Sequence, residues 1–243
     1  LSAKPLRGDW SGENHYAKDA AIAQLFAVMD ALGVQRAILV GNSSGGTLAL
    51  EAALTRPDRV QALILIAPWV YAKRPTLPRW LAGLPQMRRL SLLIGRKLGA
   101  KTLLGFSYAH PERVSPERQR LASIHTRMAG WDLAWAELLN RSLSSHVDVG
   151  QRLASIRQPA IVITGDGDKL VPMADTKRVS AVLPGATLVV LTDCGHVPQE
   201  ECPRAFMEAV GAWLESLLSS ATPVPDIRPQ TGRIAADVNA DLQ

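Results

Sequence analysis

The sequence predicts an α/β fold: a mostly parallel sheet flanked by helices, with a helical segment inserted into it. Short apolar runs alternate with stretches of helical periodicity before residue 71 and again after residue 156. Between these two parts the alternation stops, and prolines break a series of short helical patterns. With 243 residues, 47% of them hydrophobic, the chain is long enough for one large α/β domain that carries such an insertion.

The first part of the predicted core runs helix, strand, helix, strand. Residues 17–33 carry apolar side chains at helical spacing and end in Gly33, a residue type that commonly stops a helix. A strand is expected at about 37–41, a helix at Ser44–Thr55, and a strand buried on both faces at 62–67. Because strand, helix and strand follow one another, we expect the strands to be parallel.

The inserted segment is predicted to be a helical cap over residues 71–156. Ser115 followed by Pro116 is typical of a helix start, and residues 131–143 place apolar side chains on one helical face. Thirteen Lys and Arg against five Asp and Glu give residues 73–150 a net charge of +8, in a chain of net charge +5. This charge indicates a solvated helical surface or, alternatively, a cap that attracts anionic substrates.

Strands and helices alternate again after the insertion. Strands are expected at 160–164 and 187–191 with a helix at about 173–183 between them, and a last amphipathic helix begins near Pro203. The predicted domains are therefore residues 1–70 and 157–220 as the two parts of the core, 71–156 as the cap, and 221–243 as a flexible tail.

Composition narrows the classes of partner and compartment. No Lys/Arg run is interleaved with aromatic residues, so nucleic-acid binding is not expected, and the longest apolar stretch is too short for a membrane span. Two cysteines, Cys194 and Cys202, are too few for a disulfide framework, which favours a reducing, cytoplasmic location. Together with His196 they are also too few soft ligands for a metal, so no metal site is expected.

A glycine-rich turn joins the strand at 37–41 to the helix after it. The turn reads Gly-Asn-Ser-Ser-Gly-Gly over residues 41–46, and G-x-S-x-G between a strand and a helix is typical of a nucleophile elbow with Ser43 as its tip. In such a tight turn, side chains at positions 41 and 45 should collide with neighbouring backbone. The N–H of Ser44 would face a developing oxyanion. The alternative is a purely structural glycine turn.

A serine hydroxyl needs a histidine base and a carboxylate that orients it. Asp168 follows the strand at 160–164, with Asp166 as the alternative carboxylate, and His196 follows the strand at 187–191. All three loops leave the carboxyl ends of predicted parallel strands, where open α/β sheets build their sites. The chain order serine, aspartate, histidine agrees with this arrangement.

These three motifs together resemble the α/β-hydrolase superfamily, in particular its cap-bearing esterases and carbon–carbon bond hydrolases. The resemblance extends from about Gly8 to Leu218 and includes the loop Cys194-Gly195-His196 with Glu200 and Pro203 behind it. It implies that Ser43 is the nucleophile, His196 the general base and then acid, and Asp168 the orienting carboxylate. It also implies a small-molecule substrate and no cofactor.

The resemblance ranks the candidate functions. Members of the superfamily that attack with an aspartate carry it at the elbow, so the serine here argues against their reactions. Among the remaining reactions, carboxylic-ester hydrolysis ranks first. The Gly-Asn-Ser start resembles the hydrolases of ring-cleavage products, but many of those have tryptophan where this chain has Val197. A non-catalytic small-molecule binding protein is the alternative from another class. Trp69, Trp131 and Trp135 are candidates to line the acyl pocket, with ordinary core packing as the alternative.

The start of the chain departs from the family pattern. Relatives carry several strands, and the loop that donates the second oxyanion N–H, before the point that matches residue 1. The chain also begins Leu-Ser-Ala-Lys-Pro, without an initiator Met or the apolar core of a signal peptide. We therefore expect the N-terminal strands to be missing and the strand at 37–41 to lie at an edge of the sheet.

Overall fold

The computed structural model describes residues 17–71, 104–128 and 148–220, together with six single positions between them (86, 90, 93, 131, 134 and 138). In these residues four parallel strands form one sheet in the order β1 (Ala37–Asn42), β2 (Val60–Ile66), β3 (Ala160–Gly165) and β4 (Thr187–Leu191). The prediction of parallel strands is confirmed. The predicted strands differ from the observed ones by at most two residues at either end.

The longer helices are α1 (Lys18–Ala31), α2 (Ser44–Thr55), α7 (Met173–Val182) and α9 (Pro203–Ser220), each at a predicted position. The shorter ones are α5 (Pro116–Ala122) and α8 (Pro198–Glu201), and 3-10 turns lie at Pro57–Arg59, Pro111–Arg113, Ile124–Arg127, Val149–Gln151 and Leu153–Ser155. In the described part of the chain, no helix has the length and apolar character needed to cross a membrane.

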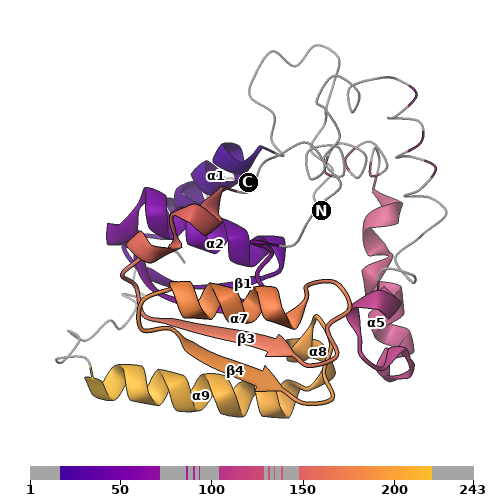
Figure 1. Cartoon of the computed structure of the whole chain (residues 1–243). Coiled ribbons are helices and arrows are strands. Elements are labelled where there is room, and N and C mark those ends of the chain that lie inside the picture. Colours follow the sequence, from indigo (N-terminus) through magenta and orange to yellow (C-terminus); the bar gives the residue numbers. More distant parts are fainter. Residues whose placement is uncertain are drawn as a thin grey trace, which may run out of the picture.

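Helices cover both faces of the sheet. On one face, apolar side chains of α1, α2 and α7, among them Phe26, Leu50 and Val179, pack against β1, β2 and β3. On the other face, Phe206 and Val210 of α9 pack against isoleucines of β2 and β3. Figure 1 shows this layering, with α9 on the opposite side of the sheet from α7. β2 and β3 are almost wholly buried, as the continuous apolar runs predict.

Local sequence signals set two of the helix ends as predicted. Gly33 has a φ of +68° just after α1, a left-handed conformation that glycine adopts without steric cost. At the start of α5, the Ser115 hydroxyl accepts a hydrogen bond from the Arg118 N–H at 3.1 Å, and Pro116 occupies the first helical position. The predicted helix start within the inserted segment is therefore confirmed.

β1 lies at one edge of the sheet formed by the described residues, as predicted. Val40, in the middle of β1, is 62% exposed, although the equivalent positions of β2 and β3 are buried. The three loops that carry the candidate residues follow the carboxyl ends of β1, β3 and β4. Because these strands are parallel, all three loops lie at the same end of the strands. In Figure 1 this is the side toward which the β3 and β4 arrows point, and α8 and α5 lie there.

Several sequence-based predictions concern other parts of the chain. Of the helix expected over residues 131–143, only Trp131, Ala134 and Leu138 belong to the described residues, and all three are helical. The predicted tail at 221–243 lies outside the described residues. The division into a two-part core and a cap remains a prediction.

Candidate active site

Ser43 occupies the sharp turn between β1 and α2. Its backbone has φ 56° and ψ −120°, a conformation that non-glycine residues rarely adopt and that stores strain at functional sites. The turn is held by backbone hydrogen bonds: the Ser43 N–H donates to the Ile66 carbonyl at 2.9 Å, and the Ser43 carbonyl accepts from the N–H of Gly46 at 3.0 Å. The serine is thus fixed at the end of β1 by the neighbouring strand β2.

The glycines of this turn have different roles. A Cβ on Gly41 would overlap the backbone carbonyl of Gly45, which confirms the steric reason predicted for Gly41. The same reason predicted for Gly45 is wrong, because a Cβ at that position meets no atom within 4 Å in the part of the chain that the structure describes. The second position that needs glycine is Gly46, where a Cβ would come within 2.9 Å of the Pro68 Cβ. Close packing of α2 against the end of β2 makes this demand.

Asp168 and His196 form a buried pair across the carboxyl ends of β3 and β4. The His196 Nδ1 lies 2.9 Å from the Asp168 Oδ2, and their side chains are 5% and 0% exposed. The other oxygen, Oδ1, accepts hydrogen bonds from the N–H groups of Leu170 at 2.8 Å and Val171 at 2.9 Å. With Nδ1–H donating to the carboxylate, Nε2 of the imidazole is left as the proton acceptor.

Asp166, the alternative carboxylate, has another partner. Its Oδ1 accepts a hydrogen bond from the N–H of Asp193 at 2.8 Å and so joins the β3 loop to the β4 loop. Asp193 has a positive φ of 62° and receives hydrogen bonds from Arg113 and His110, which lower the pKa of its carboxyl group. The structure therefore brings Asp168, and not Asp166, to the histidine.

Asn42 links the elbow to the histidine loop. Its Nδ2 donates to the His196 carbonyl at 2.9 Å and to the Ile66 carbonyl at 3.2 Å, while the His196 N–H donates to the Ser107 carbonyl at 2.8 Å. Both backbone groups of the histidine are thus held, each by a different segment of the chain. In the sequence, Asn42 is noted only as the second residue of the Gly-Asn-Ser elbow motif, which assigns its side chain no role. The role of its side chain depends on the distance between two loops that are 154 residues apart.

The oxyanion and pocket candidates lie in different settings. Ser44 is the first residue of α2, where a backbone N–H has no acceptor within its own helix.

Trp69 is half-buried beside the elbow. Its backbone N–H donates to the Ser43 carbonyl at 3.1 Å, and its backbone carbonyl accepts from Thr47 Oγ1 at 2.6 Å. Trp131 is half-buried in a helix, and Trp135 lies outside the described residues. Pocket lining by these tryptophans remains a prediction.

A disulfide joins Cys194 to Cys202, next to the histidine loop. The cysteines are eight residues apart, and the turn of α8 brings their Cα atoms to 6.2 Å, within the range a disulfide bridges. The sequence prediction excluded a framework of several disulfides, and it did not foresee this single short-range bond. Disulfides persist mainly in oxidising environments, and the cytoplasmic location remains a prediction.

A model of the alpha/beta hydrolase fold family matches residues 2–203. The chain belongs to this family. Its predicted fold class is thereby confirmed, and the loops that carry Ser43, Asp168 and His196 lie in the family's chain order. Because the hydrolase fold supports several chemistries, membership alone does not choose the bond that is cleaved.

Relatives and solved structures show which hydrolases the chain resembles. It is 27% identical over 219 residues to a 2-hydroxy-6-oxo-2,4-heptadienoate hydrolase of Pseudomonas putida, covering 82% of this chain and 71% of that protein. It is 32% identical over 187 residues to a 2-hydroxy-6-oxononadienedioate/2-hydroxy-6-oxononatrienedioate hydrolase of Burkholderia vietnamiensis, covering 76% and 65%. The structure of Est816, described as an N-acyl homoserine lactone degrading enzyme, superposes with a TM-score of 0.61 at 25% identity, covering 84% and 77%.

Proposed function

We propose that this protein is a serine hydrolase that cleaves a small carboxylic ester with Ser43, His196 and Asp168. The observation that carries the proposal is the buried hydrogen bond of 2.9 Å between Asp168 and His196, in loops beside the strained Ser43 turn. Desolvation strengthens the interaction between carboxylate and imidazole, and the carboxylate selects the tautomer that can accept a proton at Nε2. A purely structural turn would have no need of such a pair.

The proposed reaction has two acyl-transfer steps. His196 Nε2 removes the proton of the Ser43 hydroxyl as its oxygen attacks the ester carbonyl, and the Ser44 N–H donates to the oxyanion that forms. The imidazolium then returns the proton to the leaving alkoxide, and an acyl-enzyme remains. In the second step His196 deprotonates water, the hydroxide attacks the acyl carbon, and the proton passes back to Ser43. No redox change occurs, and every proton is accounted for by His196.

The packing of Val197 favours an ester substrate. Val197 follows the histidine and is buried with Leu104, Tyr108 and Val114 of the inserted segment. Val197 is 9% exposed. Its side chain therefore packs between the histidine loop and the inserted segment. Carbon–carbon hydrolases that carry tryptophan here have a larger aromatic side chain at the same point. This chain lacks that group.

The second candidate function is hydrolysis of a carbon–carbon bond in an anionic dienoate. The relatives from Pseudomonas putida and Burkholderia vietnamiensis have names of this class, and the Gly-Asn-Ser start of the elbow resembles that of hydrolases of ring-cleavage products. The net charge of +8 over residues 73–150 would attract such a substrate. Both candidates use the same serine and histidine, so they differ in the pocket rather than in the nucleophile.

The test needs no knowledge of the substrate. Wild-type protein and Ser43→Ala are exposed to a fluorophosphonate, and intact mass spectrometry counts the adducts, with circular dichroism to establish that both are folded. We expect one adduct on the wild type and none on Ser43→Ala. A folded wild-type protein that stays unlabelled would refute the proposal, and tight binding of a ligand without turnover would favour a non-catalytic binding protein.

The substrate is then chosen by direct competition. Turnover of p-nitrophenyl esters is measured beside turnover of a ring-cleavage dienoate, whose loss of visible absorbance reports cleavage. A higher kcat/KM for the esters supports the first candidate. A higher kcat/KM for the dienoate supports the second and contradicts the assignment made from Val197.

A further inference from the structure

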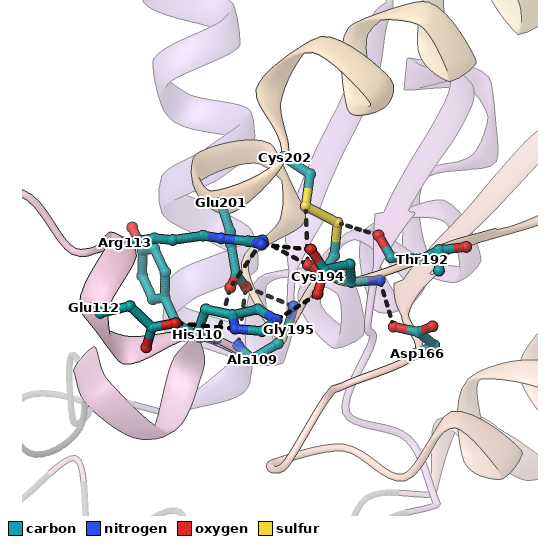
Figure 2. A network of polar contacts seen from close by, with 12 residues as sticks. Ala109, His110, Glu112, Arg113, Asp166, Thr192, Cys194, Gly195, Glu201 and Cys202 are labelled. Carbon is teal, nitrogen blue, oxygen red and sulfur yellow. Dashed lines mark hydrogen bonds and ion pairs between the residues drawn. A yellow bond between two sulfur atoms is a disulfide. The ribbon is translucent and has the colours of Figure 1, made fainter.

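A buried carboxylate lies directly behind the histidine loop. It belongs to Glu201, the last residue of α8, whose side chain is 0% exposed. Figure 2 shows the carboxylate between the backbone of Ala109 and His110 on one side and that of Gly195 on the other. The sequence motif names the neighbouring Glu200 behind the histidine loop instead. Two adjacent glutamates look alike in a sequence, and only the orientation of α8 shows that the Glu201 side chain is the buried one.

Three backbone N–H groups bind this carboxylate. Oε2 accepts from Gly195 at 2.6 Å and from Ala109 at 3.0 Å, and Oε1 accepts from His110 at 2.9 Å. Arg113 Nη1 lies 3.9 Å away. Hydrogen bonds to an ionised group are stronger than neutral ones, and together they offset the cost of burying the charge. The carboxylate therefore joins two segments that are almost ninety residues apart in the sequence.

Gly195 leads directly into His196, so its peptide sets where the imidazole begins. A Cβ on Gly195 would overlap backbone atoms of Ala109 and Tyr108, which shows that the two segments are in direct backbone contact. The His196 N–H donates to the Ser107 carbonyl at 2.8 Å, in the same contact. Movement of the segment 107–110 would therefore move the histidine. The Glu201 carboxylate binds both segments and so fixes their position relative to each other.

We propose that Glu201 is a positioning residue for His196, and that it couples the segment 107–110 of the inserted cap to the catalytic histidine. This inference rests on the proposed serine-hydrolase function. The hydrogen bonds of the Glu201 carboxylate go to backbone N–H groups, so its role is to hold these segments in place and not to react. It acts through the Gly195 peptide, and displacement of a catalytic group by about 1 Å can cost on the order of 10² in rate.

Glu200 provides a matched control on the same helix. Its Oε2 accepts from the Tyr108 hydroxyl at 3.0 Å, its Oε1 accepts from Arg118 Nη2 at 2.9 Å, and its side chain is 30% exposed. It therefore also ties α8 to the inserted segment. Among the described residues, the side-chain hydrogen bonds of Glu200 go to Tyr108 and Arg118 and not to Gly195. Loss of its charge should therefore weaken the same junction while Glu201 still holds the Gly195 N–H and, through it, the histidine.

The experiment compares Glu201→Ala, Glu201→Gln and Glu200→Gln with the wild type. The rate of fluorophosphonate labelling of Ser43 is followed by intact mass spectrometry at several probe concentrations. The temperature is kept well below the thermal unfolding midpoint of each protein. This separates the limiting rate kinact, which reports activation of Ser43 by His196, from the half-saturation concentration KI, which reports the pocket. Glutamine keeps one carbonyl oxygen for Gly195 and Ala109 but loses the acceptor for His110.

We expect Glu201→Ala to lower kinact by about 100-fold with KI unchanged within about twofold, and Glu201→Gln to fall between it and the wild type. Glu200→Gln should lower the unfolding midpoint and leave kinact unchanged. If Glu201→Ala does not fold, Glu201→Gln carries the test alone, with an expected loss of about tenfold.

Two results would overturn the positioning role of Glu201. One is a kinact equal to that of the wild type in the folded Glu201 variants, and the other is an equal loss of kinact in Glu200→Gln. Failure of the serine-hydrolase proposal has a different signature, because the wild type itself would then remain unlabelled.

Discussion

Replacement of Asp168 by asparagine tests the proposed triad with the least disturbance to the fold. Oδ1 of Asp168 accepts hydrogen bonds from the N–H groups of Leu170 and Val171, at 2.8 and 2.9 Å. These two donors require an oxygen at that position, so the side-chain amide of the Asp168→Asn variant would turn its NH₂ group toward His196. The NH₂ would then donate to Nδ1 of the imidazole.

The consequence for catalysis is a change of tautomer. An imidazole that accepts at Nδ1 carries its proton on Nε2, and it can no longer take a proton from Ser43. In Ser-His-Asp hydrolases this exchange lowers kcat by about 10⁴-fold, which corresponds to about 5 kcal/mol of activation free energy. The fold should tolerate the change, because the two backbone hydrogen bonds at Oδ1 are kept.

The assay is the rate of Ser43 labelling, followed by ester turnover, in Asp168→Asn and in Asp166→Asn. Asp166 accepts a hydrogen bond from the Asp193 N–H at 2.8 Å, and among the described residues the carboxylate that hydrogen-bonds to His196 is Asp168. The Asp166 variant should therefore label within about threefold of the wild type. Labelling of folded Asp168→Asn at the wild-type rate would refute the reasoning. A large loss in Asp166→Asn alone would assign the orienting role to the other carboxylate.

Three further perturbations follow from contacts in the same region. Reduction of the Cys194–Cys202 disulfide should lower the free energy of unfolding by about 2.5 kcal/mol, from the closure entropy of a loop of 8 residues, and calorimetry with thiol titration checks this. Asn42→Ala removes the donor to the His196 carbonyl and should slow Ser43 labelling about tenfold; an unchanged rate would contradict the link. Burial, followed by the charge of Glu200, raises the pKa of Tyr108 to about 12, above its usual value of about 10. The protonated hydroxyl therefore stabilises the fold below pH 10, and this contribution is lost as pH rises from 10 to 12. Denaturant unfolding across that range should show a smaller decline in Tyr108→Phe than in the wild type, and equal declines would exclude the effect.

The sequence alone determined the elements and the loops that carry the candidate site. Apolar periodicity predicted β1 to β4, α1, α2, α7 and α9 because burial of one face or of both faces leaves a regular pattern in the chain. Gly33 and Ser115 marked helix ends because their local backbone chemistry acts over a few residues. Ser43, Asp168 and His196 could be selected because parallel strands place their following loops at one edge of the sheet.

Tertiary structure decided every feature that depends on contact between distant segments. The sequence favoured Asp168 and kept Asp166 as the alternative, and only the positions of the loops show that Asp168 contacts His196 while Asp166 accepts from the Asp193 N–H. The hydrogen bond from Asn42 to the His196 carbonyl also depends on the positions of two loops. The steric need for Gly46 arises from its approach to Pro68 at the end of another strand. Glu201 was missed because its partners are backbone N–H groups of segments remote in sequence, and a backbone N–H carries no signature in the amino-acid letters. Burial and turns leave local patterns in the sequence and can be predicted from it. Hydrogen bonds between distant segments depend on the three-dimensional fold and cannot.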